Sequence, residues 1–154
     1  MSVTKRLKSA LRLRSGQAVL LAGLSAACGS NTIEVWDAWA RATAPGQEVA
    51  AAYMTIRSPV ETELIAAVSE VAEAIEIHSM SMGDGMMRMR KLDKLSLPAR
   101  KAFALEPAGY HLMLLNLRRP LNQGQTIPLV LIFERDGETQ VKVETIAQVR
   151  GRAD

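Results

Sequence analysis

The regular alternation of short apolar runs with turn residues constrains the fold of this chain more than any other feature of its sequence. Turn-forming Gly, Pro, Asn and Asp residues interrupt these runs about every eight to twelve positions, and no stretch has the period of a long amphipathic helix. The pattern is typical of all-β domains and predicts a two-sheet β-sandwich. The predicted strands are Ile33–Trp36, Ala38–Ala42, Ala51–Arg57, Glu63–Ser69, Ala74–Met82, Met86–Leu92, Lys101–Leu105, Tyr110–Leu117, Thr126–Glu134 and Thr139–Val149.

Two of the interruptions are signals for tight hairpins. Asp136-Gly137 lies between two β-rich runs, and Asp-Gly is a preferred pair for a two-residue hairpin loop. Gly83-Asp84-Gly85 predicts a second hairpin, which would place the strand ending at Met82 beside the one that starts at Met86. Between the strands, Val68–Ala74 is also open to a helical turn. We find no internal repeat, so we predict a single domain over residues 33–150.

The first 27 residues have the composition of an export signal. They contain five of the 19 basic residues and no acidic one, followed by the apolar run Ala18–Leu24 and small residues up to Cys28. That run is too short to span a bilayer, which takes about 20 apolar residues. The rest of the chain has 14 basic and 16 acidic residues, so the formal net charge of +3 comes from the leader. This distribution predicts no nucleic-acid partner.

Two processing routes are compatible with the end of this leader. Ser25 and Ala27 suit ordinary signal-peptidase cleavage before Cys28, whereas the same stretch resembles a lipoprotein box that would make Cys28 a lipidated first residue. Cys28 is the only cysteine, and a lone free thiol has no evident use in an exported chain, which favours lipidation. We expect a periplasmic or envelope protein with a signal peptide (1–27), a tether (28–32) and a membrane contact through lipid on Cys28.

Histidine and methionine are concentrated in two segments. The chain has two histidines, His78 and His111, and Met113 follows the second by two residues. Residues i and i+2 of a strand face the same side, so His111 and Met113 share a face, and the predicted hairpin folds a group of methionines towards His78. These methionines all lie within ten residues: Met80, Met82, Met86, Met87 and Met89.

Imidazole together with thioether sulfur favours Cu(I) over harder divalent ions. Neutral ligands add no charge to a monovalent ion. Blue-copper electron transfer requires a cysteine thiolate, and Cys28 lies in the leader. We therefore predict that the site binds and releases copper rather than transferring electrons. The sequence contains no Ser-His-Asp or Cys-His arrangement and no glycine-rich phosphate loop, so we predict no enzymatic activity.

Simpler interpretations exist for several of these residues. Met80, Met82, Met86 and Met87 could assist copper capture or transfer by ligand exchange. Methionine also fills irregular cores and forms adaptable binding surfaces, and packing or partner contact is the simpler role of these four residues. An alternative function is therefore an envelope lipoprotein that docks a protein through a Met-rich hairpin. Glu76 precedes His78 by two residues and could orient its ring as a hydrogen-bond acceptor, but a solvated carboxylate is the simpler interpretation. Trp36 and Trp39, three positions apart, are predicted to lie on opposite faces of a strand.

The spacing of four residues resembles the motif of the PCu(A)C family of periplasmic copper chaperones. In that motif a His is followed by ten residues and a Met, and then by twenty-one residues and His-x-Met. His78, Met89 and His111-Leu112-Met113 have this spacing without adjustment. Ala38-Trp39-Ala40-Arg41 and Ala50-Ala51-Ala52-Tyr53-Met54 are also similar to family segments, and the resemblance covers about residues 33 to 148.

This resemblance implies a cupredoxin-like β-sandwich that binds Cu(I) through His78, Met89, His111 and Met113. It also implies delivery to a copper-accepting membrane protein, the respiratory oxidase subunit with the binuclear copper centre, or exchange with another copper carrier. Many family members have a C-terminal tail rich in His and Met. Residues 150–154 contain neither, so we expect one copper ion per chain.

Overall fold

The computed structural model describes residues 32–151, and the regular structure in them is entirely β. The predicted signal peptide, Cys28 and nearly all of the predicted tether lie outside these residues. Within the described part of the chain no helix is long and apolar enough to cross a membrane. The all-β prediction is confirmed. The strands are β1 (Glu34–Arg41), β2 (Ala50–Arg57), β3 (Thr62–Val68), β4 (Ala72–Gly83), β5 (Met86–Leu92), β6 (Leu95–Leu97), β7 (Ala102–Leu105), β8 (Tyr110–Leu117), β9 (Thr126–Arg135) and β10 (Thr139–Arg150).

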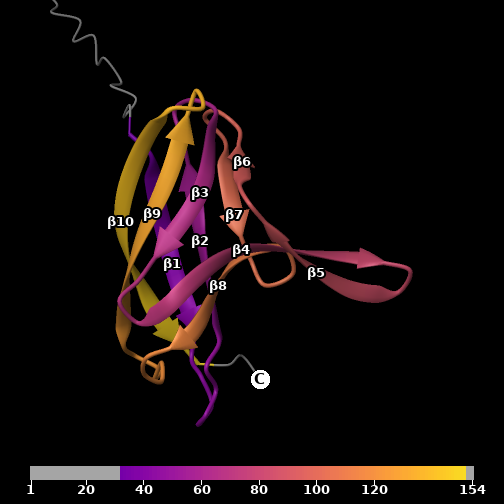
Figure 1. The fold of residues 1–154 in the computed structure, drawn as a ribbon, viewed down its shortest axis with the longest axis vertical. Helices are drawn as coiled ribbons and strands as arrows, with labels where there is room; N and C mark the ends of the chain where they lie inside the picture. Colours follow the sequence, from indigo (N-terminus) through magenta and orange to yellow (C-terminus); the bar gives the residue numbers. More distant parts are fainter. Residues whose placement is uncertain (1–31, 152–154) are drawn as a thin grey trace, which may run out of the picture.

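All ten strands belong to one hydrogen-bonded sheet, where the sequence predicted two. The order is β5-β4-β8-β2-β1-β10-β9-β3-β6, with β7 pairing to β2. Strand β2 exchanges partners along its length, because Ala50–Ala52 pair with β8 whereas Met54–Arg57 pair with β7. The sheet folds over so that β3, β9 and β10 lie across from β1 and β2 (Figure 1). Two layers therefore enclose the core although the hydrogen bonding is continuous.

Strand β1 contains a bulge that the sequence pattern did not reveal. Trp36 is opposite Thr55 and Trp39 is opposite Tyr53, so three steps on β1 match two steps on β2. Asp37, inside the bulge, has a φ of 52°. An extra residue in one strand reverses its alternation, and Thr55 and Tyr53 share a face. Both tryptophans therefore lie on the same face, and the prediction of opposite faces is wrong.

Two further details differ from the sequence prediction. Within Val68–Ala74 there is no helical turn: β3 ends at Val68, residues 69–71 form a short turn, and β4 begins at Ala72. The short strand β6 was not predicted; it pairs with β3 and buries Leu95 and Leu97. With three residues, this strand is too short for its alternation to stand out in the sequence.

Both predicted hairpins are present. Asp84 and Gly85 have φ values of 51° and 75° between the paired residues Gly83 and Met86, as a type I′ loop requires. Asp136 and Gly137 also have positive φ values, with the Glu138 amide donating to the Arg135 carbonyl. The paired residues there are Arg135 and Thr139, so this loop has three residues instead of the predicted two. The β4–β5 hairpin projects sideways from the body of the sandwich (Figure 1), so its outer half has no sheet packed on either face.

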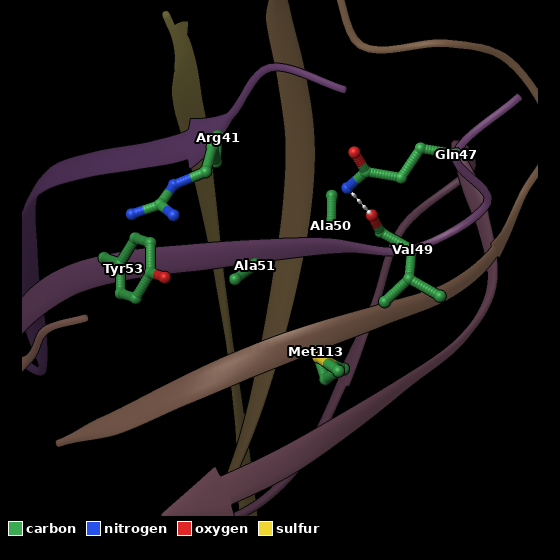
Figure 2. Close-up of a pocket in the computed structure, with 7 residues that line it drawn as sticks. All are labelled: Arg41, Gln47, Val49, Ala50, Ala51, Tyr53 and Met113. Carbon is green, nitrogen blue, oxygen red and sulfur yellow. Dashed lines mark hydrogen bonds between the residues drawn. The ribbon is translucent and has the colours of Figure 1, made fainter. Parts of the chain in front are cut away.

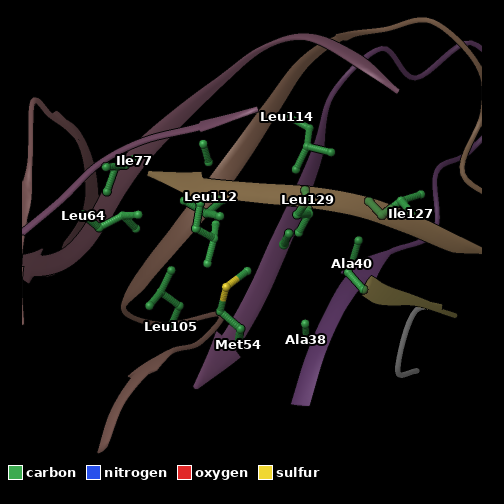
Figure 3. Packing of buried hydrophobic residues seen from close by; sticks show 14 of the residues in the cluster. Ala38, Ala40, Met54, Leu64, Ile77, Leu105, Leu112, Leu114, Ile127 and Leu129 are labelled. Atoms are coloured by element: carbon green, nitrogen blue, oxygen red, sulfur yellow. The ribbon is translucent and has the colours of Figure 1, made fainter. Parts of the chain in front are cut away.

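The core is built mainly from aliphatic side chains at alternate strand positions. On β8, Leu112 and Leu114 are completely buried, and they point towards the residues of β2 and β9 (Figure 3). Removal of this apolar surface from water is the main driving force for folding. Met113, the residue between these leucines, faces the other side of the sheet. The largest fully buried side chains elsewhere are Phe133, Met54, Ile56, Leu64, Leu97, Leu121, Ile127, Leu129, Leu131 and Val71.

Candidate metal centre

The two histidines form a directly opposed pair on neighbouring strands. His78 of β4 is in register with His111 of β8, and their ring centroids are 5.7 Å apart with an interplanar angle of 60°. Directly opposed residues project to one face of the sheet. Because Leu112 faces the core, this face is the outer one. The structure thus brings together two side chains that are 33 residues apart in the chain.

The predicted methionine ligands lie on the same face, on either side of this pair. Met113 is opposite Glu76, and Met89 is opposite Met80, so each methionine is a diagonal neighbour of His78. Diagonal positions are about 7–8 Å apart, within reach of long side chains. Met89 is 48% exposed and lies on the projecting hairpin, where it faces a methionine rather than a histidine.

Glu76 orients the ring of His78. The His78 Nε2 lies 2.8 Å from the Glu76 carboxylate, and Lys91 Nζ contacts the other carboxylate oxygen at 2.6 Å. The hydrogen bond from Lys91, followed by that from His78, lowers the pKa of Glu76. The interpretation of Glu76 as a merely solvated carboxylate is therefore wrong. The contact agrees instead with the alternative that the two-residue spacing of Glu76 and His78 indicated, because such residues share a face.

One nitrogen of His78 has no partner. With Nε2 donating to Glu76, the Nδ1 atom is the acceptor, and it is buried without any hydrogen bond. Buried polar atoms are nearly always satisfied, so an orphaned one calls for an explanation. A buried imidazole nitrogen without a hydrogen-bond partner, on a ring beside His111, is a candidate metal ligand.

His111 is held as a neutral ring. Only 3% of it is exposed, and burial lowers its pKa, opposed by the bond to Gly109 and assisted by His78. Its Nδ1–H donates to the Gly109 carbonyl at 3.3 Å. This bond favours the tautomer that leaves Nε2 unprotonated, with a lone pair for a ligand.

The lowered pKa of His111 predicts that metal-free protein loses stability in mild acid. The unfolded chain takes up a proton near the ordinary histidine value of 6.5, whereas the native ring takes it up only at lower pH. This contribution is therefore complete above about pH 6.5 and is lost as the pH falls below it. Denaturant unfolding at several pH values measures the effect. In the variant His111→Asn this part of the pH dependence should disappear, and an unchanged profile would contradict the prediction.

A row of aromatic rings from β1 and β2 lies beside His111, on the side of the histidine pair away from the β4–β5 hairpin. Tyr53 lies 6.3 Å from His111, Trp39 lies 4.5 Å from Tyr53, and the Arg150 guanidinium lies 5.4 Å from the centre of the Trp39 ring. Burial raises the pKa of Tyr53, so this hydroxyl stays protonated. The sequence pattern did not reveal these rings, because the bulge in β1 sets the direction of Trp39 and the register of β2 with β8 places Tyr53 beside His111.

An open pocket of about 210 Å³ lies beside Met113 (Figure 2). The side chains of Arg41 and Tyr53 border it at one end and that of Gln47 at the other. Met113 therefore reaches both the histidine face and this pocket. The full lining is Arg41, Gln47, Val49, Ala50, Ala51, Tyr53 and Met113.

The side chains available as metal ligands would select one class of metal ion. Among residues 32–151, no three His, Cys, Asp or Glu side chains are grouped so that they could hold a metal ion. The two imidazoles would thus need the neighbouring thioethers to complete a site. Neutral nitrogen with thioether sulfur suits a soft monovalent ion and is a poor match for Zn²⁺, Mg²⁺ or Ca²⁺.

Comparison with known families assigns the chain. The family model described as "Putative lipoprotein LpqE-like" matches residues 33–145, which include every strand from β1 to β9 and half of β10. The chain belongs to the LpqE-like family. A relative of this LpqE-like protein is "Putative lipoprotein Lxx21020" from Leifsonia xyli subsp. xyli (strain CTCB07), which is 29% identical over 108 residues. That match covers 70% of this chain and 64% of the relative.

Solved structures similar to this LpqE-like protein are PCuAC domains and related copper proteins. The copper-bound PCuAC domain from PmoF2 superimposes with a TM-score of 0.63 at 22% identity, over 78% of this chain and 93% of that one. The Cu(I) form of DR1885 from Deinococcus radiodurans is 32% identical, with a TM-score of 0.53, over 73% and 74%. The resemblance to the PCu(A)C family and the cupredoxin-like fold are confirmed.

Proposed function

We propose that this LpqE-like protein is a copper chaperone that binds one Cu(I) ion tightly through His78, Met89, His111 and Met113. The observation that carries this proposal is the opposed histidine pair, in which His78 has a buried and unpartnered Nδ1 atom. The copper-bound relatives support the same cargo. Soft thioether ligands favour Cu(I), so the ion is bound and released as Cu(I) without any redox step.

The exposure of the ligands favours transfer by stepwise exchange. His111 is buried, whereas 48% of Met89 is exposed on the projecting hairpin. An acceptor can therefore displace Met89 first, while both imidazoles still hold the ion. The Glu76 carboxylate keeps the ring of His78 in place during exchange, as hydrogen-bonded partners of metal ligands generally do.

The proposal also covers where the protein acts and which protein receives its copper. The chain is exported and carries lipid on Cys28, as the lipoprotein descriptions of its family and of its relative support. Its recipient is a copper-accepting membrane protein of the envelope, the oxidase subunit with a binuclear copper centre. The role is carriage of an ion rather than catalysis.

Titration of metal-free protein with Cu(I) tests the proposal. Under reductant and against a competing chelator, we expect one tightly bound equivalent. The X-ray absorption spectrum of the loaded protein should contain both nitrogen and sulfur scatterers. Absence of binding, or a spectrum with nitrogen and oxygen alone, would refute the proposed site.

Exposed methionines also favour a second candidate, a protein-docking module. Met82, Met86 and Met87 are between 56% and 70% exposed, and methionine surfaces adapt to varied partners. This candidate leaves the unpartnered nitrogen of His78 without a role. Capture of an envelope partner that is indifferent to copper chelators would support docking, whereas capture that requires copper would support the chaperone.

A further inference from the structure

The β4–β5 hairpin carries more thioethers on the histidine face than the site described above uses. Met80 is directly opposite Met89, and Met82 is directly opposite Met87. Opposed residues share a face, and His78 lies on the same face two residues before Met80. The hairpin therefore presents four thioethers in two successive pairs, leading from its tip to the two histidines.

These methionines have no packing role that accounts for them. Met82 is 70% exposed and Met87 is 56% exposed, and neither belongs to the core cluster or packs against it. Figure 1 shows that the outer half of the hairpin stands clear of the sandwich. A group of exposed apolar side chains on one face of a projecting hairpin is typical of a binding site.

We propose that Met80, Met82 and Met87 form a second, weaker binding site for a soft monovalent ion, Cu(I) or Ag(I), near the tip of the hairpin. Opposed side chains have Cβ atoms about 4.5–5.5 Å apart, a separation that lets two thioethers reach one ion from opposite sides. Met80 completes the set from the neighbouring position on the same face. Thioether sulfur selects soft ions over Zn²⁺ and Mg²⁺.

The charges near the tip do not oppose the binding of a cation, but the entropy of the exposed side chains makes the binding weak. Asp84 is exposed and lies 3.6 Å from Arg88, while Lys91 is paired with Glu76, so neither cation lies free beside the sulfur atoms. Ordering exposed methionine side chains costs conformational entropy. The second ion should therefore exchange rapidly and be lost to a chelator that leaves the first ion bound.

The site at the tip provides a path by which copper reaches the two histidines. On this face the pair next to Met82 and Met87 is Met80 and Met89. The next residue of β4 on the same face is His78, which is opposite His111 of β8. Each move exchanges one neutral ligand for another, and copper stays Cu(I) throughout. The use of the site in loading depends on the proposed chaperone function, whereas binding at the tip does not.

The test uses the full mature chain with ¹³C-labelled methionine methyl groups, titrated with Ag(I). The first equivalent should shift the methyl signals of Met89 and Met113, and the second should shift those of Met82 and Met87 under fast exchange. The double variant Met82→Leu, Met87→Leu conserves volume, and it should lose the second equivalent but keep the first.

Met86→Leu is the matched control. Met86 is an exposed methionine on the same hairpin, but it is adjacent to Met87 and so faces the other side of β5. This variant should keep both equivalents. A second equivalent that persists in the double variant, or no response of Met82 and Met87 in the native protein, would overturn the inference. Loss of the first-equivalent shifts at Met89 and Met113 would instead refute the proposed function.

Discussion

The double variant His111→Asn, Met113→Leu should lose high-affinity Cu(I) binding. The loss should exceed the roughly 10- to 100-fold that removal of an orienting partner costs at a metal site, because two ligands are removed outright. Asn at position 111 retains a donor for the Gly109 carbonyl, which His111 contacts through Nδ1. Leu at position 113 conserves volume. Competition titration against a Cu(I) chelator measures the affinity.

Two controls make this result specific. Met86→Leu removes a methionine that faces away from the histidines, so its affinity should equal that of the native protein. Thermal unfolding of the double variant should show a cooperative transition, which separates loss of the site from loss of the fold. Native affinity in a folded double variant would rule out His111 and Met113 as ligands.

Leu112→Ala should destabilise the fold without disturbing the metal site. Leu112 lies between His111 and Met113 but faces the core, where it is completely buried and in register with Ala52 and Ile77. Removing its buried methyl groups and leaving a cavity should cost about 2–5 kcal/mol. Denaturant unfolding of the metal-free protein measures this loss, which should appear as a lower midpoint with an unchanged slope.

The single variant Met113→Leu, at the adjacent position, should give the opposite result. It should lower Cu(I) affinity and leave the free energy of unfolding nearly unchanged. Folded Leu112→Ala should bind Cu(I) as the native protein does, and excess Cu(I) should raise its unfolding temperature by mass action. A large loss of affinity in folded Leu112→Ala would show that core packing and the site are coupled, contrary to the strict alternation of β8.

Local features of the sequence predicted most of the strands correctly. Alternation along β8 separated His111 and Met113 from Leu112, and the positive φ values of Asp84 and Gly85 are those expected of a tight Asp-Gly turn. Such features depend on a few adjacent residues, because side-chain direction and turn conformation are set within one or two peptide units. Strand β6 was missed because three residues give too short a pattern.

The single sheet could not be predicted in the same way. Whether β2 pairs with β8 alone or also with β7 depends on which arrangement buries the most apolar surface across the whole domain. The bulge at Asp37 is equally non-local in its effect, because one extra residue in β1 turned Trp39 towards Tyr53, the ring that lies beside His111.

By itself the sequence determined the all-β class, the Met-rich hairpin and the types of side chain available for a soft ion. Only the tertiary structure decided that β4 lies beside β8 in the register that opposes His78 to His111, and that Glu76 occupies one nitrogen of His78 and leaves the other free. The physical reason is that alternation and turns arise from neighbouring residues, whereas pairing and register between distant strands arise from burial of the whole core.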